Sequence, residues 1–292
     1  MNNQKFARIC LFGKPNAGKS TLFNQIIEKN ISIVTHKINT TRNNIRGIVN
    51  QQNTQLVFID TPGFLYNPQS QLEKKITCLS LQKINQVDFL CIVIDVTKYN
   101  AMENIHLEYS INTQLAHPPI IILNKIDLLR NKNHILSLIS TLQKQSFHHI
   151  YLISAIKNQG ILNLKNYLFQ HAPQHHWQYQ NTLITDQSLR MIAQDITREK
   201  LYLFLHQEIP YSLTVETESW IETKRTVILH QKIFVLKESQ KGIILRAQGK
   251  LIKRINILSR NRISQLLNKR VSLYLRIKVQ KKWIKQIKNT LI

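Results

Sequence analysis

The sequence predicts an α/β domain with a mostly parallel sheet, followed by a smaller α+β domain. Over about the first 170 residues, short apolar runs alternate with longer helical patterns, which is typical of a parallel sheet covered by helices. The pattern then lapses into a polar, His-rich stretch that contains Pro173. After this stretch the order changes to helix, two strands, helix and strand, and 292 residues suffice for each part to bury its own core.

The expected strands of the first part are short and apolar, as strands buried on both faces should be. They are Ala7–Phe12, Gln55–Ile59, Phe89–Asp95, Ile120–Leu123 and Ile150–Ile153. Helix-length segments, such as Ser20–Lys29 and Asn133–Gln145, lie between them. We therefore divide the chain into a first domain over residues 1–172, a linker over 173–186 and a second domain over 187–292.

The second domain is expected to begin with a long helix over Gln187–Glu208, which stops before Pro210 because proline cannot continue it. The remaining predicted elements are two alternating strands, a short apolar run, a basic helix and a last strand. They cover Tyr211–Glu222, Thr226–Lys237, Gly242–Leu245, Lys250–Leu267 and Val271–Val279.

The distribution of charge favours an anionic partner for the second domain. The net charge is +24, but a chain this rich in Ile, Asn, Lys and Gln can owe part of that charge to biased composition. From Ser239 to the C-terminus, however, there are fifteen Lys and Arg residues and no Asp or Glu. A uniform bias would not remove every acidic residue from one end.

The chain shows no secretory signal and no apolar run near the ~20 residues that span a bilayer. Its cysteines, Cys10, Cys78 and Cys91, lack metal-ligand spacing and are interpreted as small apolar residues in a reducing compartment. The His-rich linker lacks the cysteines or carboxylates that would indicate a metal site. We expect a cytoplasmic protein.

A phosphate-binding loop is predicted between the first strand and the first helix. Residues 13–20, GKPNAGKS, match the pattern G-x-x-x-x-G-K-[ST] in the strand–turn–helix context that its mechanism requires. Backbone N–H groups of the loop and the helix N-terminus can surround phosphates. Lys19 can reach the β and γ oxygens, and the Ser20 hydroxyl can bind Mg²⁺.

Two further motifs extend the nucleotide site. Asp60-Thr61-Pro62-Gly63 ends a strand, so Asp60 can hold Mg²⁺, and the Gly63 N–H can approach the γ-phosphate. Asn124-Lys125-Ile126-Asp127 ends another strand, and its Asp can accept hydrogen bonds from the guanine N1–H and 2-amino group, which adenine does not offer. The residues expected to contact GTP are Gly13, Lys14, Pro15, Asn16, Ala17, Gly18, Lys19, Ser20, Thr21, Asp60, Thr61, Pro62, Gly63, Asn124, Lys125, Asp127, Ser154 and Ala155.

The segment Thr35–Gly47 is expected to switch with the nucleotide, its Thr41 rather than Thr40 binding Mg²⁺ beside Ser20 and Asp60. Lys19, Thr41, Asp60 and Gly63 are the expected catalytic residues. Phe64 stands where related enzymes place a water-orienting Gln, so unaided hydrolysis should be slow. Asn16 could ligate a monovalent cation such as K⁺ or could only brace the loop, and the sequence leaves both open.

The sequence in and around these motifs resembles that of the Era family of ribosome-assembly GTPases. GKPNAGKSTLFN, INTTRNNIRGI, FIDTPG, NKID and ISA carry this likeness, and so does the more specific pairing of REKL with EIPYSLTVE. The resemblance implies a P-loop GTPase domain followed by a type II KH domain, with Mg²⁺ and GTP or GDP as ligands. It also implies a monomer that binds 16S ribosomal RNA, matures the small (30S) subunit and associates peripherally with the inner membrane.

The resemblance places the RNA-binding loop at Arg246-Ala247-Gln248-Gly249, where Arg246 replaces the first glycine of the KH pattern GxxG. Lys250, Lys253 and Arg254 follow within one helical turn and are the expected phosphate contacts. The basic tail Lys278–Lys288 could touch RNA or a membrane. Two alternatives remain: an RNA-binding module with a degraded GTPase domain, and a related GTPase serving tRNA modification or the large subunit.

Overall fold

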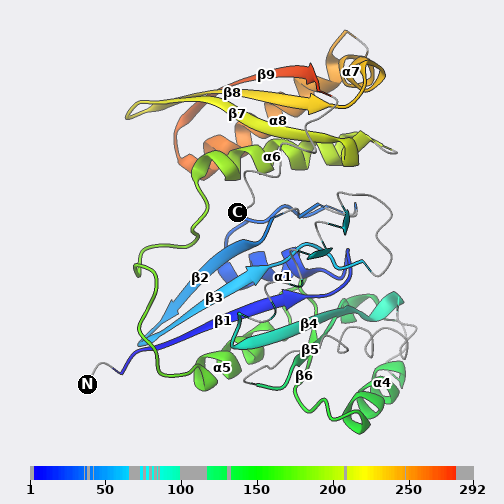
Figure 1. Cartoon of the computed structure of the whole chain (residues 1–292), viewed down its shortest axis with the longest axis vertical. Helices are drawn as coiled ribbons and strands as arrows, with labels where there is room; N and C mark the ends of the chain where they lie inside the picture. Colours follow the sequence, from blue (N-terminus) through cyan, green and yellow to red (C-terminus); the bar gives the residue numbers. More distant parts are fainter. Residues whose placement is uncertain are drawn as a thin grey trace. The chain divides into compact units, whose positions relative to one another are not determined.

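A computed structural model describes residues 3–35, 37, 40–41, 43–65, 73–74, 77–78, 81, 84, 86–98, 117–129, 133–206, 209–246 and 248–280. The chain forms two compact units, drawn in Figure 1. The first unit ends at Asp186, and the second begins at Gln187 and also includes Ile33–Thr40. Among the described residues, no helix combines the length and the apolar character that crossing a membrane would require.

The first unit contains a six-stranded sheet in the order β2-β3-β1-β4-β5-β6. Only β2 runs antiparallel to its neighbour, so the prediction of a mostly parallel sheet is confirmed. Because β1, β3, β4 and β5 end at one edge, they bring the P-loop, Asp60 and Asn124 to the same side of the sheet. The strands are β1 (Lys5–Phe12), β2 (Ile45–Gln51), β3 (Thr54–Asp60), β4 (Phe89–Asp95), β5 (Ile120–Asn124) and β6 (Ile150–Ile153).

Helices cover this sheet. Helices α1 (Lys19–Ile27) and α5 (Ile161–His171) contact each other, and both contact β3. Helix α1 also contacts β1, and helix α5 also contacts β6. Helix α4 (Asn133–Lys144) contributes Leu138 and Leu142 to a buried cluster that includes Phe12 of β1 and Leu90, Ile92 and Ile94 of β4. Burial of such side chains fixes the strand ends, from which the functional loops project.

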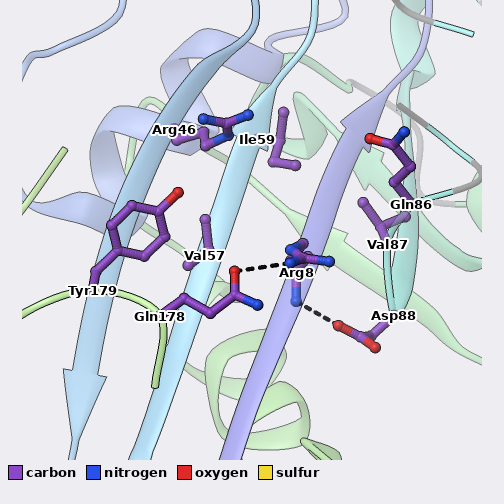
Figure 2. A pocket seen from close by; sticks show the side chains of 9 residues that line it. All are labelled: Arg8, Arg46, Val57, Ile59, Gln86, Val87, Asp88, Gln178 and Tyr179. Carbon is purple, nitrogen blue, oxygen red and sulfur yellow. Dashed lines mark hydrogen bonds between the residues drawn. The ribbon is translucent and has the colours of Figure 1, made fainter. Parts of the chain in front are cut away.

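Residues 173–186 lie along the first unit. Gln55 donates its Nε2 to Tyr179 O at 3.0 Å and accepts from the Gln178 and Tyr179 N–H groups. Arg8 donates to the Gln178 Oε1 at 2.8 Å, and Arg46 forms an ion pair with Asp186. Figure 2 shows the pocket of about 500 Å³ beside this segment, and its lining shares no residue with the predicted nucleotide site.

The second unit is an α+β domain with a three-stranded sheet in the order β7-β8-β9. Strands β7 and β8 are antiparallel, whereas β8 and β9 are parallel. Helices α6 and α8 lie on the same side of the sheet (Figure 1) and pack into one core with Leu213, Ile233 and Ile255. Its elements are α6 (Leu189–Phe204), β7 (Leu213–Glu222), β8 (Thr226–Val235), α7 (Glu238–Leu245), α8 (Lys250–Leu267) and β9 (Arg270–Val279).

Several elements differ from the sequence prediction. Strand β2 and helix α5 were not predicted, although Ile161, Leu164 and Leu168 have the helical spacing of a buried face. The run Gly242–Leu245 is the end of helix α7, which begins at Glu238. The long helix ends at Phe204 rather than at Glu208, and Glu208 itself lies outside the described residues.

Candidate functional site

The P-loop wraps around the Lys19 side chain. The Lys19 ammonium donates to the carbonyl oxygens of Gly13 and Lys14, both at 2.8 Å, and only 5% of the residue is exposed. Gly18 has φ +95°, and a Cβ built there would lie 2.2 Å from Asn124 Nδ2. Only glycine fits this position, because both the backbone angle and the neighbouring amide exclude a side chain. The loop is therefore shaped by close backbone approach, as phosphate binding requires.

A cluster of oxygen donors lies beside the start of α1. The Ser20 hydroxyl donates to Asp60 Oδ2 at 2.7 Å and lies 2.9 Å from the Thr41 hydroxyl. Thr40 instead pairs with the Thr35 hydroxyl at 2.6 Å. The structure thus brings together the three residues that were predicted to bind Mg²⁺, and of the two threonines it places Thr41 there.

The Asp60 carboxylate is fully buried, and within the described part of the chain its Oδ1 has no hydrogen-bond partner. Burial raises the pKa of Asp60, while hydrogen bonds from Ser32 and Ser20 and the charge of Lys19 act in the opposite direction. A buried carboxylate oxygen without a partner is costly unless something binds it. Hydroxyl and carboxylate oxygens are the hard donors that Mg²⁺ prefers, so this cluster fits that ion.

Asn124 joins three loops at the guanine end of the site. Its Nδ2 donates to Ala17 O at 2.8 Å, and its Oδ1 accepts from Ala155 N at 3.0 Å. Asp127, which was predicted to accept from the base, is held by the Ser154 hydroxyl at 2.5 Å. The P-loop, the Asn-Lys-x-Asp turn and the Ser154–Ala155 turn are thus held in one arrangement.

The Lys125 side chain is held over this turn by Asp95, whose Oδ2 lies 2.5 Å from Lys125 Nζ. Burial alone would raise the pKa of Asp95, but hydrogen bonds from Lys125 and Thr97 outweigh it and keep that pKa below its ordinary value. Lys125 itself has φ +68°, a left-handed backbone conformation that is uncommon for residues other than glycine.

The loop after Asp60 packs directly on the P-loop. A Cβ built on Gly63 would lie 2.6 Å from the Pro15 Cγ, so no other residue fits there without movement. The Thr61 hydroxyl donates to Leu11 O at 2.7 Å inside the core. The Phe64 ring lies 5.4 Å from the Phe12 ring, so this side chain is engaged in core packing rather than in orienting water.

The predicted RNA loop joins α7 to α8. Arg246, Gln248, Lys250, Lys253 and Arg254 are exposed. Arg246 has φ −48°, whereas Gln248 and Gly249 have φ of +54° and +76°. The positive angles therefore fall on the second half of the loop, and arginine meets no backbone strain at the position of the missing glycine. Ala247 lies outside the described residues.

Two contributors to the nucleotide site were missed by the sequence reasoning. Ser32 donates its hydroxyl to Asp60 Oδ2 at 2.6 Å and is itself held by Asn24. Asp95 is the partner of Lys125 described above. Asp95 ends a predicted strand at the same edge as Asp60, and this signal could have identified it. Ser32 has no comparable signal, because its loop carries no motif.

Comparison with known proteins agrees with both units. A family model described as 50S ribosome-binding GTPase matches residues 8–125, and one described as KH domain matches residues 208–284. GTPase Era of Mesorhizobium japonicum is 37% identical over 277 residues, covering 94% of this chain and 88% of its own length. GTPase Era of Brucella suis biovar 1 is 37% identical over 280 residues, with the same coverage.

Solved structures give the same result over both units. Aquifex aeolicus Era bound to GDP·AlF₄⁻ superposes with a TM-score of 0.91 at 28% identity, over 98% of this chain and 97% of that one. Era in complex with MgGDPNP and nucleotides 1506–1542 of 16S ribosomal RNA matches with the same values. The expected P-loop GTPase and KH folds are therefore confirmed, and the chain belongs to the Era family of GTPases.

Proposed function

We propose that this chain is a GTP-controlled switch that binds 16S ribosomal RNA and acts in the assembly and maturation of the small ribosomal subunit. The observation that carries the proposal is the match, over 98% of the chain, to Era holding both MgGDPNP and a 16S rRNA segment. The buried nucleotide site of the first unit and the exposed basic loop of the second support it independently.

In the proposed switch, the P-loop and Lys19 hold the phosphates of GTP, and Ser20, Thr41 and Asp60 hold Mg²⁺. The metal supplies charge neutralisation to the phosphates when it is bound. Lys19 lies within reach of two loop carbonyls, so its ammonium can exchange these contacts for phosphate oxygens. Thr41 belongs to the segment that is expected to change with the nucleotide, which lets the γ-phosphate control its position.

Guanine selectivity is assigned to Asp127, which the Ser154 hydroxyl orients. Two charge-assisted hydrogen bonds, at about 1.5–3 kcal/mol each, correspond to a preference on the order of 10²–10⁴ for GTP over ATP. Asp127→Asn should remove this preference without unfolding the protein. Competition between GTP and ATP for labelled nucleotide measures it, and undiminished selectivity would exclude Asp127 from the site.

Hydrolysis should be slow without an activator, because Phe64 packs on Phe12 and offers no polar group to water. We propose that Asn16 helps to bind K⁺, which would neutralise part of the developing charge. Multiple-turnover phosphate release in K⁺ and in Na⁺ tests this. Identical rates in the two salts would leave Asn16 only the role of bracing the loop.

The RNA-binding role is tested by crosslinking the full chain to RNA and sequencing the adducts. Adducts concentrated near the 3′ end of 16S rRNA would support the proposal. Adducts concentrated on tRNA or on large-subunit RNA would contradict it. Large-subunit RNA is included as an outcome because the family model that matches residues 8–125 is described as a 50S ribosome-binding GTPase. That range, however, contains none of the proposed RNA contacts.

The proposal also includes a monomeric state and a peripheral association with the inner membrane. It divides the chain into residues 1–172, 173–186 and 187–292. The contacts of residues 173–186 with Gln55, Arg8 and Arg46 indicate that this linker is attached to the first unit. Sedimentation measures the oligomeric state, and flotation with anionic vesicles measures membrane association.

A further inference from the structure

The sheet of the second unit has one face that its helices cover and one that is exposed. Along β9, residues with buried and partly buried side chains alternate with exposed ones. Helices α6 and α8 pack against the inner face, and Figure 1 shows both on the same side of the sheet. The exposed residues of β9 are Arg270, Ser272, Tyr274, Arg276 and Lys278.

An aromatic pair lies at the centre of the outer face. Tyr274 of β9 is directly opposite His230 of β8, and their rings are stacked, with centroids 4.7 Å apart and an interplanar angle of 13°. Tyr274 is nevertheless 56% exposed. Ile221 of β7, also 56% exposed, adds an apolar side chain to the same face. The pair therefore presents a preformed, flat aromatic surface to its surroundings.

Positive charge surrounds this pair. Arg276 and Arg270 lie two and four residues from Tyr274 along the strand, on the same face. In the register, Lys232 of β8 lies between Arg276 of β9 and Glu216 of β7, and Lys232 forms an ion pair with Glu218. Among the described residues, no salt bridge involves Arg270, Arg276 or Lys278. Their charges are therefore available to a partner.

We propose that this outer face, centred on Tyr274 and His230, is a second RNA-binding surface that stacks an unpaired base and holds the adjacent phosphates with Arg276 and Arg270. Stacked bases together with flanking phosphate contacts are the usual mode of single-strand recognition. The surface is separate from the Arg246–Arg254 loop, because α8 packs against the opposite face of the sheet. The inference rests on the proposed RNA-binding function.

The test uses the full chain with Mg·GDPNP and a labelled RNA of nucleotides 1506–1542 of 16S rRNA. Fluorescence anisotropy should show about a tenfold loss of affinity for Tyr274→Ala, because this change removes the aromatic ring on which one base stacks. Tyr274→Phe keeps the ring and should bind within about twofold of wild type. GDP affinity should be unchanged in both variants because the nucleotide site lies in the first unit, and a far-ultraviolet circular dichroism spectrum that matches wild type establishes that the second unit is folded. Crosslinking with 4-thiouridine RNA should label Tyr274 or His230.

Lys253→Ala is the companion variant, because Lys253 lies in the other proposed RNA site. If the wild type binds the RNA, Lys253→Ala weakens binding, Tyr274→Ala does not, and no crosslink forms on the sheet, the second surface is overturned and the proposed function stands. Failure of the wild type to bind this RNA would overturn both. A dimer that Tyr274→Ala dissociates in sedimentation, with unchanged RNA affinity, would assign the face to a second copy of the chain and also overturn the inference.

Discussion

The nucleotide site and the RNA loop are built in opposite ways. Asp60 and Asn124 are almost completely buried, and each is held by hydrogen bonds from neighbouring loops. Arg246, Lys253 and Arg254 are exposed on a loop and the helix that follows it. A buried site held by hydrogen bonds tolerates little change in shape, whereas long exposed cations act mainly through charge. Shape should therefore limit nucleotide binding, and ionic strength should limit RNA binding.

The largest effect is expected from Gly18→Ala. The new methyl group would meet Asn124 Nδ2 at 2.2 Å, and the backbone would have to hold φ +95° with a side chain. We expect GDP affinity to fall by more than about 100-fold, because the loop must open to relieve the clash. Calorimetric titration with GDP and Mg²⁺ measures this.

Gly242→Ala is the matched control, since nothing lies within 4 Å of a Cβ built there in helix α7. It should leave GDP affinity unchanged and increase the free energy of unfolding by about 0.5–1 kcal/mol. Equal nucleotide affinities for the two variants would show that close approach at Gly18 does not shape the site.

A smaller effect is expected from Lys253→Ala. Loss of one phosphate contact should weaken RNA binding several-fold and reduce the slope of log K against log salt by about one. GTP affinity should not change. A constant salt slope together with a lower affinity would contradict the claim that this region binds RNA mainly through charge, because the lost contact would then not be electrostatic.

Arg246→Gly restores the glycine of the KH pattern and should change RNA affinity by less than about threefold. Arg246 has φ −48°, so no backbone strain is relieved by glycine, and the variant loses one cation. The salt slope should again fall by about one. A large gain in affinity in the same anisotropy measurement would show that the arginine obstructs the loop.

The smallest effect concerns the Lys125–Asp95 pair and pH. Because the pKa of Asp95 lies below its ordinary value of 3.8, the pair stabilises the folded state above about pH 4 and ceases to do so as pH falls through the folded pKa. Wild type should exceed Asp95→Asn by about 1 kcal/mol in free energy of unfolding at pH 6. Urea titrations should show this difference shrinking below pH 4, and a constant difference would contradict the assignment.

The sequence predicted most of the first unit because its functional residues sit in motifs with fixed positions after strands. Gly18, Asp60 and Asn124 were located this way, and the structure brings them together. It could not predict Ser32, whose contact with Asp60 depends on how a loop without a motif folds. Strand β2 was missed in part because its first three residues, Ile45–Gly47, were assigned to the switch segment. Helix α7 was missed because Gly242 lowers the helical propensity of its second half.

The second unit was predicted less completely for a related reason. The outer face of its sheet depends both on its positive charge and on the register of β8 with β9, but only the charge can be recognised in the sequence. His230 and Tyr274 are far apart along the chain, and their stacking depends on the parallel pairing of the two strands. Likewise, the replacement of glycine by Arg246 in the KH pattern did not predict the backbone φ of −48° at this residue.

Competition between GTP and ATP for the nucleotide-free chain, in the presence of Mg²⁺, tests the central claim most directly. The buried site around Lys19, Asp60 and Asn124, with Asp127 oriented by Ser154, predicts that GTP displaces a labelled guanine nucleotide at least about 100-fold better than ATP. Equal displacement by the two nucleotides, or no binding of either by folded protein, would contradict it.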